Sequence, residues 1–148
     1  MKLIQIDDKT PYVLIAVYGT LLHGGLNHRI FMQGKSEFLG RTTTPALFSM
    51  HTCGLFPVLT TGTTQITCEV YKIRSNKVLQ DIFRLEGCCG KLDEESHGYK
   101  IKQIETKFGE AYIFWLPNFE GSDATLIKSG DWQRRSLPRK NFIHKHIK

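Results

Sequence analysis

The chain has 148 residues, of which 41% are hydrophobic and 23% are charged, a composition typical of one folded domain with its own core. No apolar run approaches the roughly 18 residues that a membrane-spanning helix requires. The acidic pair Asp7-Asp8 interrupts the start of the chain before the apolar region of a signal peptide could form. We therefore expect a cytoplasmic protein with no membrane partner.

The net charge of +6 resides entirely in the C-terminal segment. Residues 133–148 carry 6 of the 20 Lys and Arg residues and no Asp or Glu, so residues 1–132 hold 14 basic and 14 acidic residues. We predict one domain over 1–132 and a basic tail over 133–148. Nucleic acid would be bound through this tail and not by the fold, and a solvated terminus is the simpler explanation of the same charges.

The four cysteines, Cys53, Cys68, Cys88 and Cys89, do not have the spacing of a zinc site. Cys68 lies in an alternating strand pattern and is expected to be a small core residue. We predict free thiols, no metal and no cofactor.

The first half of the chain indicates short strands around one short helix. Residues 13–18 form an apolar run without alternation, which is typical of a strand buried on both faces. Asn27 is a candidate N-cap for a helix that carries Ile30, Phe31 and Met32 and stops at Gly34. Residues 36–43 and 46–50 are expected to be extended, and the proline within 55–59 indicates an edge or a loop near the site.

The second half contains the clearest helix, over residues 75–86. Ser75 or Asn76 would cap it, Gly87 would end it, and its buried stripe would consist of Val78, Leu79, Ile82, Phe83 and Leu85. Strands are predicted over 65–74, 99–106 and 111–116, with an irregular loop over 88–98. About seven strands and two helices predict an α+β fold with a curled, largely antiparallel sheet.

A glycine turn after the first strand is the first candidate site. Tyr18, Gly19, Thr20 and Leu21 follow a buried strand, so their backbone N–H groups lie beyond its end and could receive an oxygen-rich ligand. A plain glycine turn without a ligand explains the same four residues.

Glu86 is the second candidate. It ends the predicted helix, at the negative end of the backbone dipole and beside the apolar Leu85. The dipole and the apolar side chain both disfavour an ionised carboxylate. A carboxyl group with a pKa raised toward neutrality can take a proton and return it. A solvated glutamate at a helix end is the alternative.

Four segments in order resemble the γ-glutamylcyclotransferase-like family, which includes γ-glutamylamine cyclotransferases. They are Tyr18-Gly19-Thr20-Leu21 with Gly25 and Asn27-His28, the strand around Glu69–Ile73, the helix end Leu85-Glu86-Gly87, and Ala111–Phe114 followed by Ser129–Trp132. The likeness covers about residues 12–132.

The resemblance implies a small mixed, mostly antiparallel α+β barrel. It also implies that Tyr18, Gly19, Thr20 and Leu21 bind the glutamyl end of a substrate and that Glu86 is the general base and acid. Tyr99 is the candidate for the family's tyrosine that follows this glutamate. The implied reaction releases 5-oxoproline from a γ-glutamyl amine or related small molecule, without a metal or cofactor.

Two alternatives stay open at this point. The chain could be a non-catalytic module that uses the same pocket to bind a small ligand or a partner protein. Glu94 or Glu95, which precede Tyr99, could also supply the carboxyl group. Substrate identity and oligomeric state do not follow from the sequence.

Overall fold

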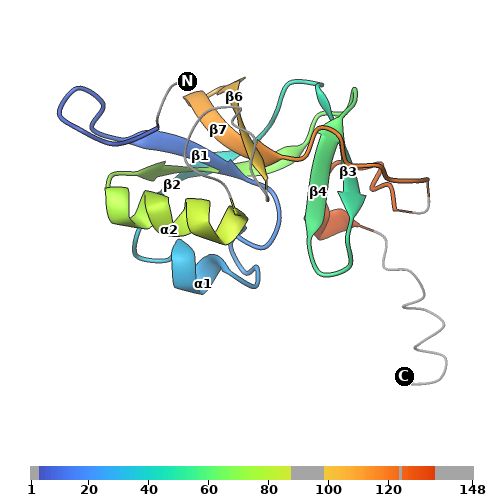
Figure 1. Cartoon of the computed structure of the whole chain (residues 1–148), viewed down its shortest axis with the longest axis horizontal. Helices are drawn as coiled ribbons and strands as arrows, with labels where there is room; N and C mark the ends of the chain where they lie inside the picture. Colours follow the sequence, from blue (N-terminus) through green and yellow to red (C-terminus); the bar gives the residue numbers. More distant parts are fainter. Residues whose placement is uncertain (1–3, 88–98, 124, 136–148) are drawn as a thin grey trace.

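The structure, a computed structural model, describes residues 4–87, 99–123 and 125–135. In this part of the chain it has seven strands, two α-helices and a terminal 3-10 helix, arranged as a mixed and mostly antiparallel α+β fold (Figure 1). The predicted fold class is confirmed. The elements are β1 (Val13–Val17), α1 (His28–Phe31), β2 (Glu37–Thr43), β3 (Phe48–Thr52), β4 (Pro57–Thr61), β5 (Thr67–Ile73), α2 (Asn76–Glu86), β6 (Lys100–Thr106), β7 (Gly109–Trp115) and η1 (Trp132–Arg134).

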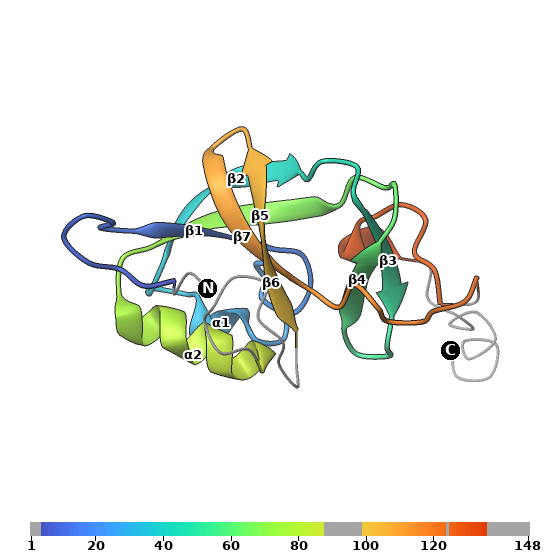
Figure 2. The same cartoon turned by 45° about the horizontal axis from the view of Figure 1, so that its top comes forward.

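The main sheet has the order β2-β5-β1-β7-β6, with β1 at its centre. All five residues of β1 are buried, as the unbroken apolar run predicts. β1 pairs with β5 antiparallel and with β7 parallel, while every other pair in the sheet is antiparallel. Both helices lie on the same side of this sheet (Figure 2).

The described strands do not close into the barrel that the family resemblance implies. β2 and β6 are the two ends of the main sheet, and β3 and β4 form a separate hairpin. This hairpin joins the rest of the sheet near the end of β7, where the Leu116 N–H donates to the Leu59 carbonyl oxygen at 2.8 Å. The hairpin therefore stands beside the end of the sheet, across from the C-terminal end of α2 (Figure 1).

Helix α2 has the limits that its sequence predicts. The Ser75 hydroxyl accepts a hydrogen bond from the Val78 N–H at 3.3 Å, and Gly87 ends the helix with a φ of 74°. Leu79, Ile82 and Phe83 are fully buried, and burial of such side chains stabilises the fold by about 1.5–3 kcal/mol each. The prediction for Leu85 was wrong: this side chain is exposed and lines the cavity described below instead of packing in the core.

Helix α1 is a single short turn. Asn27 occupies its N-cap position, but the Asn27 side chain makes no capping hydrogen bond and binds Thr20 instead. Of the three apolar residues expected on this helix, Met32 is buried and Ile30 is exposed. Among the described residues, no helix has the length and apolar character needed to cross a membrane.

Candidate active site

The first wall of the site is the turn that follows β1. The chain bends at Gly19, where a Cβ atom would lie 2.6 Å from both Cγ and Cδ of Pro57. Only glycine permits this approach, so the turn rests directly on the first residue of β4. A hydrogen bond from the Leu22 N–H to the Gly19 carbonyl oxygen, at 3.0 Å, closes the bend.

Hydrogen bonds from Asn27 and His28 hold the carbonyl groups of this turn. The Asn27 N–H donates to the Thr20 carbonyl oxygen at 2.8 Å, and Asn27 Nδ2 donates to Thr20 Oγ1 at 2.9 Å. His28 Nδ1 lies 2.9 Å from the Leu21 carbonyl oxygen. Because a carbonyl oxygen only accepts, this geometry assigns the neutral His28 ring the tautomer with its proton on Nδ1.

The backbone N–H groups of the same turn are available to bind a ligand. Among the described residues, the N–H groups of Gly19, Thr20 and Leu21 have no hydrogen-bond partner, and all three residues line one cavity. Successive backbone N–H groups that converge on a cavity form a binding site for an anionic oxygen. We call residues Gly19–Leu21 the amide cradle.

Glu69 of β5 holds the chain just after the cradle. Glu69 is buried, and its Oε1 accepts hydrogen bonds from the His23 N–H at 2.8 Å and from the Tyr71 hydroxyl at 2.9 Å. The backbone of the turn is thus tied to the central part of the sheet through a buried carboxylate.

Sequence reasoning missed these supporting residues. His28 is buried, and neither its contact with Leu21 nor the tertiary partners of Asn27 and Glu69 were foreseen. A charged residue, Glu69, between the apolar residues Cys68 and Val70 was the one available signal.

The second wall of the site is the C-terminal end of α2, which carries Glu86. The Glu86 side chain lines the same cavity as the amide cradle. The volume of this cavity is about 390 Å³. Burial raises the pKa of the Glu86 carboxyl group from 4.5 to about 7. The predicted direction of this shift agrees with the structure, although its cause is desolvation in the cavity and not the helix end or the exposed Leu85.

The Glu86 carboxyl group remains accessible from the cavity. The residue keeps part of its surface exposed, and no described residue makes a hydrogen bond to its carboxyl oxygens. A carboxyl group in this condition is half protonated near neutral pH and has no internal partner that holds its proton.

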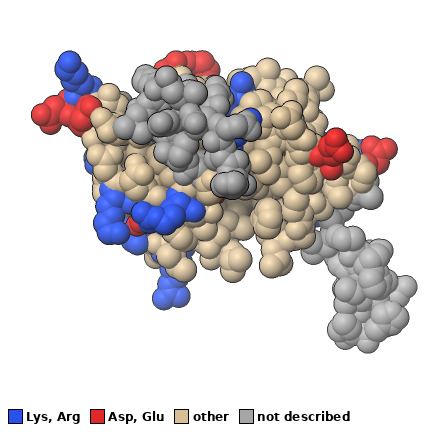
Figure 3. Space-filling model, viewed as in Figure 1, with Lys and Arg blue, Asp and Glu red and all other residues tan. Residues whose placement is uncertain are grey.

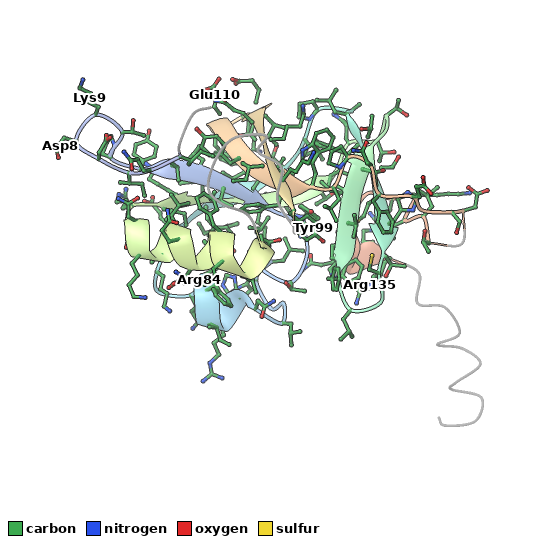
Figure 4. All side chains as sticks on the ribbon, in the orientation of Figure 1. Asp8, Lys9, Arg84, Tyr99, Glu110 and Arg135 are labelled. Atoms are coloured by element: carbon green, nitrogen blue, oxygen red, sulfur yellow. The ribbon has the colours of Figure 1, made fainter. Side chains whose placement is uncertain are left out.

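Two tyrosines complete the cavity. The Tyr18 hydroxyl donates to the Phe114 carbonyl oxygen at 2.5 Å, and the Tyr99 hydroxyl donates to the Pro57 carbonyl oxygen at 2.6 Å. Tyr99 lies between the end of α2 and β4 (Figure 4). Burial raises the pKa of both phenols, and the nearby Glu86 charge raises it further, so both stay protonated at neutral pH.

The cavity brings together all six residues that the sequence singled out: Tyr18, Gly19, Thr20, Leu21, Glu86 and Tyr99. The alternative carboxylates Glu94 and Glu95, and the predicted loop over 88–98, lie outside the described residues. The arrangement combines N–H donors that suit an anionic oxygen with a carboxyl group whose pKa is about 7, and these are the groups that a small-molecule acid–base site requires.

Comparison with known proteins shows the family of the chain. The profile of the family described as "Gamma-glutamyl cyclotransferase, AIG2-like" matches residues 15–134, and the chain belongs to this family. A Vibrio cholerae protein named "Putative gamma-glutamylcyclotransferase" is 32% identical over 123 residues, which cover 82% of this chain and 96% of that protein.

Solved structures share the fold. An uncharacterised protein from Pyrococcus horikoshii aligns with a TM-score of 0.67 at 27% identity, over 90% of this chain and 97% of that one. An AIG2-like protein from Mus musculus aligns with a TM-score of 0.63 at 19% identity, over 88% of this chain and 98% of that one. The second likeness concerns the fold alone.

Proposed function

We propose that the protein is a γ-glutamylcyclotransferase that releases 5-oxoproline from a γ-glutamyl amine or a related small molecule. The observation that supports this most strongly is the shared cavity of the amide cradle and a Glu86 carboxyl group whose pKa is about 7. Membership of the γ-glutamyl cyclotransferase family agrees with it.

The cradle binds the glutamyl half of the substrate. The N–H groups of Gly19, Thr20 and Leu21 suit the substrate α-carboxylate, or the oxyanion that forms on the γ-carbonyl during attack. The Tyr18 hydroxyl donates its hydrogen bond to the Phe114 carbonyl oxygen. The lone pairs of the Tyr18 oxygen can therefore accept a hydrogen bond from the substrate α-ammonium group.

The nucleophile is part of the substrate. Glu86, as a carboxylate, takes one proton from the α-ammonium group, and the resulting amine attacks the γ-carbonyl carbon to close a five-membered lactam. Glu86 returns the proton to the departing nitrogen as the C–N bond breaks. The attacking nitrogen also loses a second proton, which Glu86 carries to the leaving nitrogen in the same way. Two protons therefore pass from the α-nitrogen to the departing amine, which leaves as an ammonium ion, and Glu86 ends the cycle as the carboxylate with which it began.

The expected rate enhancement has two physical sources. An oriented intramolecular attack can lower the barrier by about 7–11 kcal/mol, and general acid–base catalysis typically adds a factor of about 10²–10⁴. A carboxyl group with a pKa near the working pH is both a competent base and a competent acid. The proposal requires no metal and no cofactor.

The proposal includes the domain organisation and the location of the protein. We assign the catalytic domain to residues 1–132 and the basic tail to 133–148, and we assign the protein to the cytosol. Any binding of nucleic acid is assigned to the tail alone.

The test is an assay for 5-oxoproline with purified protein and a panel of γ-glutamyl amines, amides and amino acids. We expect release from at least one compound. Stabilisation of the protein by these compounds with no release from any of them would instead identify a non-catalytic binding module.

A further inference from the structure

The structure contains a second cavity, with a volume of about 470 Å³. Its lining comes from the chain around α1, from the start of β2 and from β5. It shares no lining residue with the first cavity, which holds the amide cradle and Glu86. The proposed reaction makes no use of the second cavity, so its side chains call for an explanation of their own.

Glu69 supplies the second cavity with a buried carboxylate that has one free oxygen. The residue is only 6% exposed, and its Oε1 accepts the hydrogen bonds from the His23 N–H and the Tyr71 hydroxyl. No described residue donates to its Oε2. Oε2 still has accessible surface, since Trp115 Nε1 is the one described polar side-chain atom that is both unpartnered and closed to solvent. This free oxygen therefore opens into the cavity that Glu69 lines.

Four rings in a row line the same cavity. The ring centroids of His23 and His28 lie 5.2 Å apart, and those of His28 and Tyr71 lie 5.7 Å apart. The Phe38 ring follows, with its centroid 5.4 Å from that of Tyr71. The faces of phenylalanine and tyrosine rings attract an organic cation, and a carboxylate beside such rings completes a cage for an ammonium group.

Among the described residues, no cation neutralises the Glu69 carboxylate. Glu69 takes part in none of their ion pairs, and no Lys or Arg lines the second cavity. The nearby Lys35 Nζ donates to the Ile30 carbonyl oxygen at 2.7 Å. On the face shown in Figure 3, the Lys and Arg side chains gather over α2, which does not line this cavity. Buried charges are usually paired, so a bound cation is the partner that this site lacks.

The side chains fit an organic cation better than other ligands. Among the described residues, no group of three His, Cys, Asp or Glu side chains is placed to hold a metal ion, so His23, His28 and Glu69 do not form a metal site. An anion would be repelled by Glu69, and a neutral molecule would leave its charge without a partner. A primary ammonium group offers Oε2 both a positive charge and a hydrogen bond.

We propose that the cavity lined by Glu69, Tyr71, Phe38 and His28 is a second binding site, for a small primary ammonium compound with an apolar body. The ammonium group donates to Glu69 Oε2, and the apolar body packs against the Phe38 and Tyr71 rings. The site does not depend on the proposed cyclotransferase activity, because its residues are separate from the first cavity.

A matched pair of compounds tests the site by calorimetric titration of the full chain at neutral pH. 2-Phenylethylammonium and 2-phenylethanol have the same body and differ in the charged group. We expect the ammonium compound to bind roughly tenfold or more tightly than the alcohol, because only it pairs with a carboxylate. Equal affinities, or no measurable binding of the ammonium compound, would overturn the proposal.

Variants of two lining residues test which groups bind. Glu69→Gln keeps an oxygen that can accept both hydrogen bonds but removes the charge, so affinity for 2-phenylethylammonium should fall roughly tenfold or more. Phe38→Ala removes a ring that is 55% exposed, so the fold should hold while affinity falls roughly two- to fivefold. Tyr12→Ala is the control, since Tyr12 is 42% exposed and does not line the cavity.

The outcome is decisive even if Glu69→Gln does not fold. Affinity that is unchanged in a folded Glu69→Gln variant rejects the site. If that variant is unfolded, Phe38→Ala decides: affinity equal to that of Tyr12→Ala rejects the site, and weaker affinity supports it.

Glu86→Gln separates the two cavities, because an ammonium compound could also pair with the Glu86 carboxylate. We expect 2-phenylethylammonium to bind Glu86→Gln as it binds the wild type, and to shift the NMR signals of the His23 and His28 ring protons in both. Binding that is lost in Glu86→Gln but kept in Glu69→Gln would place the compound in the first cavity and overturn the proposal. None of these measurements requires turnover, so the site can fail while the cyclotransferase proposal stands.

Discussion

Two glutamates near the turn after β1 differ in the surroundings of their carboxyl groups. The Glu69 carboxylate oxygen Oε1 accepts hydrogen bonds from the His23 N–H and the Tyr71 hydroxyl. The Glu86 carboxyl group, which lines the same cavity as the amide cradle, accepts no hydrogen bond from any described residue. Glu69 is buried, whereas Glu86 keeps part of its surface open to the cavity. Two internal donors hold the Glu69 oxygen in place, while no donor holds the Glu86 carboxyl group, whose raised pKa lets it exchange a proton with a bound molecule.

The largest effect should come from removing the proton carrier. Glu86→Gln keeps the size of the side chain but cannot exchange a proton, so we expect 5-oxoproline release to fall by about 10²–10⁴ with the fold intact. Glu105→Gln, at an exposed position on β6, is the control and should be neutral. Unchanged release in Glu86→Gln, measured as kcat/KM, would reject Glu86 as the general base.

The same substitution should change how stability depends on pH. The folded-state pKa of Glu86 is raised above 4.5 to about 7, so the folded state holds its proton more tightly than the unfolded state does. The free energy of unfolding of the wild-type protein therefore decreases as the pH rises from about 4.5 to 7, by the contribution of this one group. Glu86→Gln has no such group and should not show this decrease.

Chemical denaturation at about pH 5 and about pH 8 measures this effect. We expect the advantage of Glu86→Gln over the wild type in the free energy of unfolding to be larger at pH 8 by about 2–3 kcal/mol. An advantage that does not vary with pH would show that the Glu86 carboxyl group is not desolvated.

Removing the Glu69 carboxyl group should act first on stability. Glu69→Ala leaves the His23 N–H and the Tyr71 hydroxyl without their acceptor, which should lower the free energy of unfolding by about 1–3 kcal/mol. Glu37→Ala breaks only the exposed ion pair with Arg74 and should cost about 0–1 kcal/mol. If the two variants unfold at the same denaturant concentration, Glu69 does not anchor the cradle.

The smallest of these effects concerns the position of the cradle itself. Gly19→Ala puts a methyl group 2.6 Å from Cγ and Cδ of Pro57, so the turn must shift and kcat/KM should fall by about tenfold. Pro57→Ala removes both of those atoms, and the double variant should recover part of the loss. A double variant as weak as Gly19→Ala alone would mean that the contact with Pro57 does not position the amides.

The sequence predicted the parts of the fold that depend on local patterns. The limits of α2 follow from the Ser75 cap, the helical spacing of Leu79, Ile82 and Phe83, and the left-handed Gly87. The central strand follows from its unbroken apolar run. These features are encoded within a few residues, so no tertiary information was needed to find them.

The rest required contacts between distant segments. Leu85 has the spacing of a core residue, yet its side chain is exposed and lines the cavity. Asn27 has the identity of a helix cap, yet its side chain binds Thr20. In both cases a local rule gave way to a partner that sequence spacing does not reveal.

The most direct test of the central claim is a carbon-13 NMR titration of the glutamate carboxyl groups in the wild-type protein and in Glu86→Gln. The account predicts one carboxyl resonance with a midpoint of about 7 that is absent from the variant. It would be contradicted if every glutamate of the folded wild-type protein titrated near the ordinary value of about 4.3.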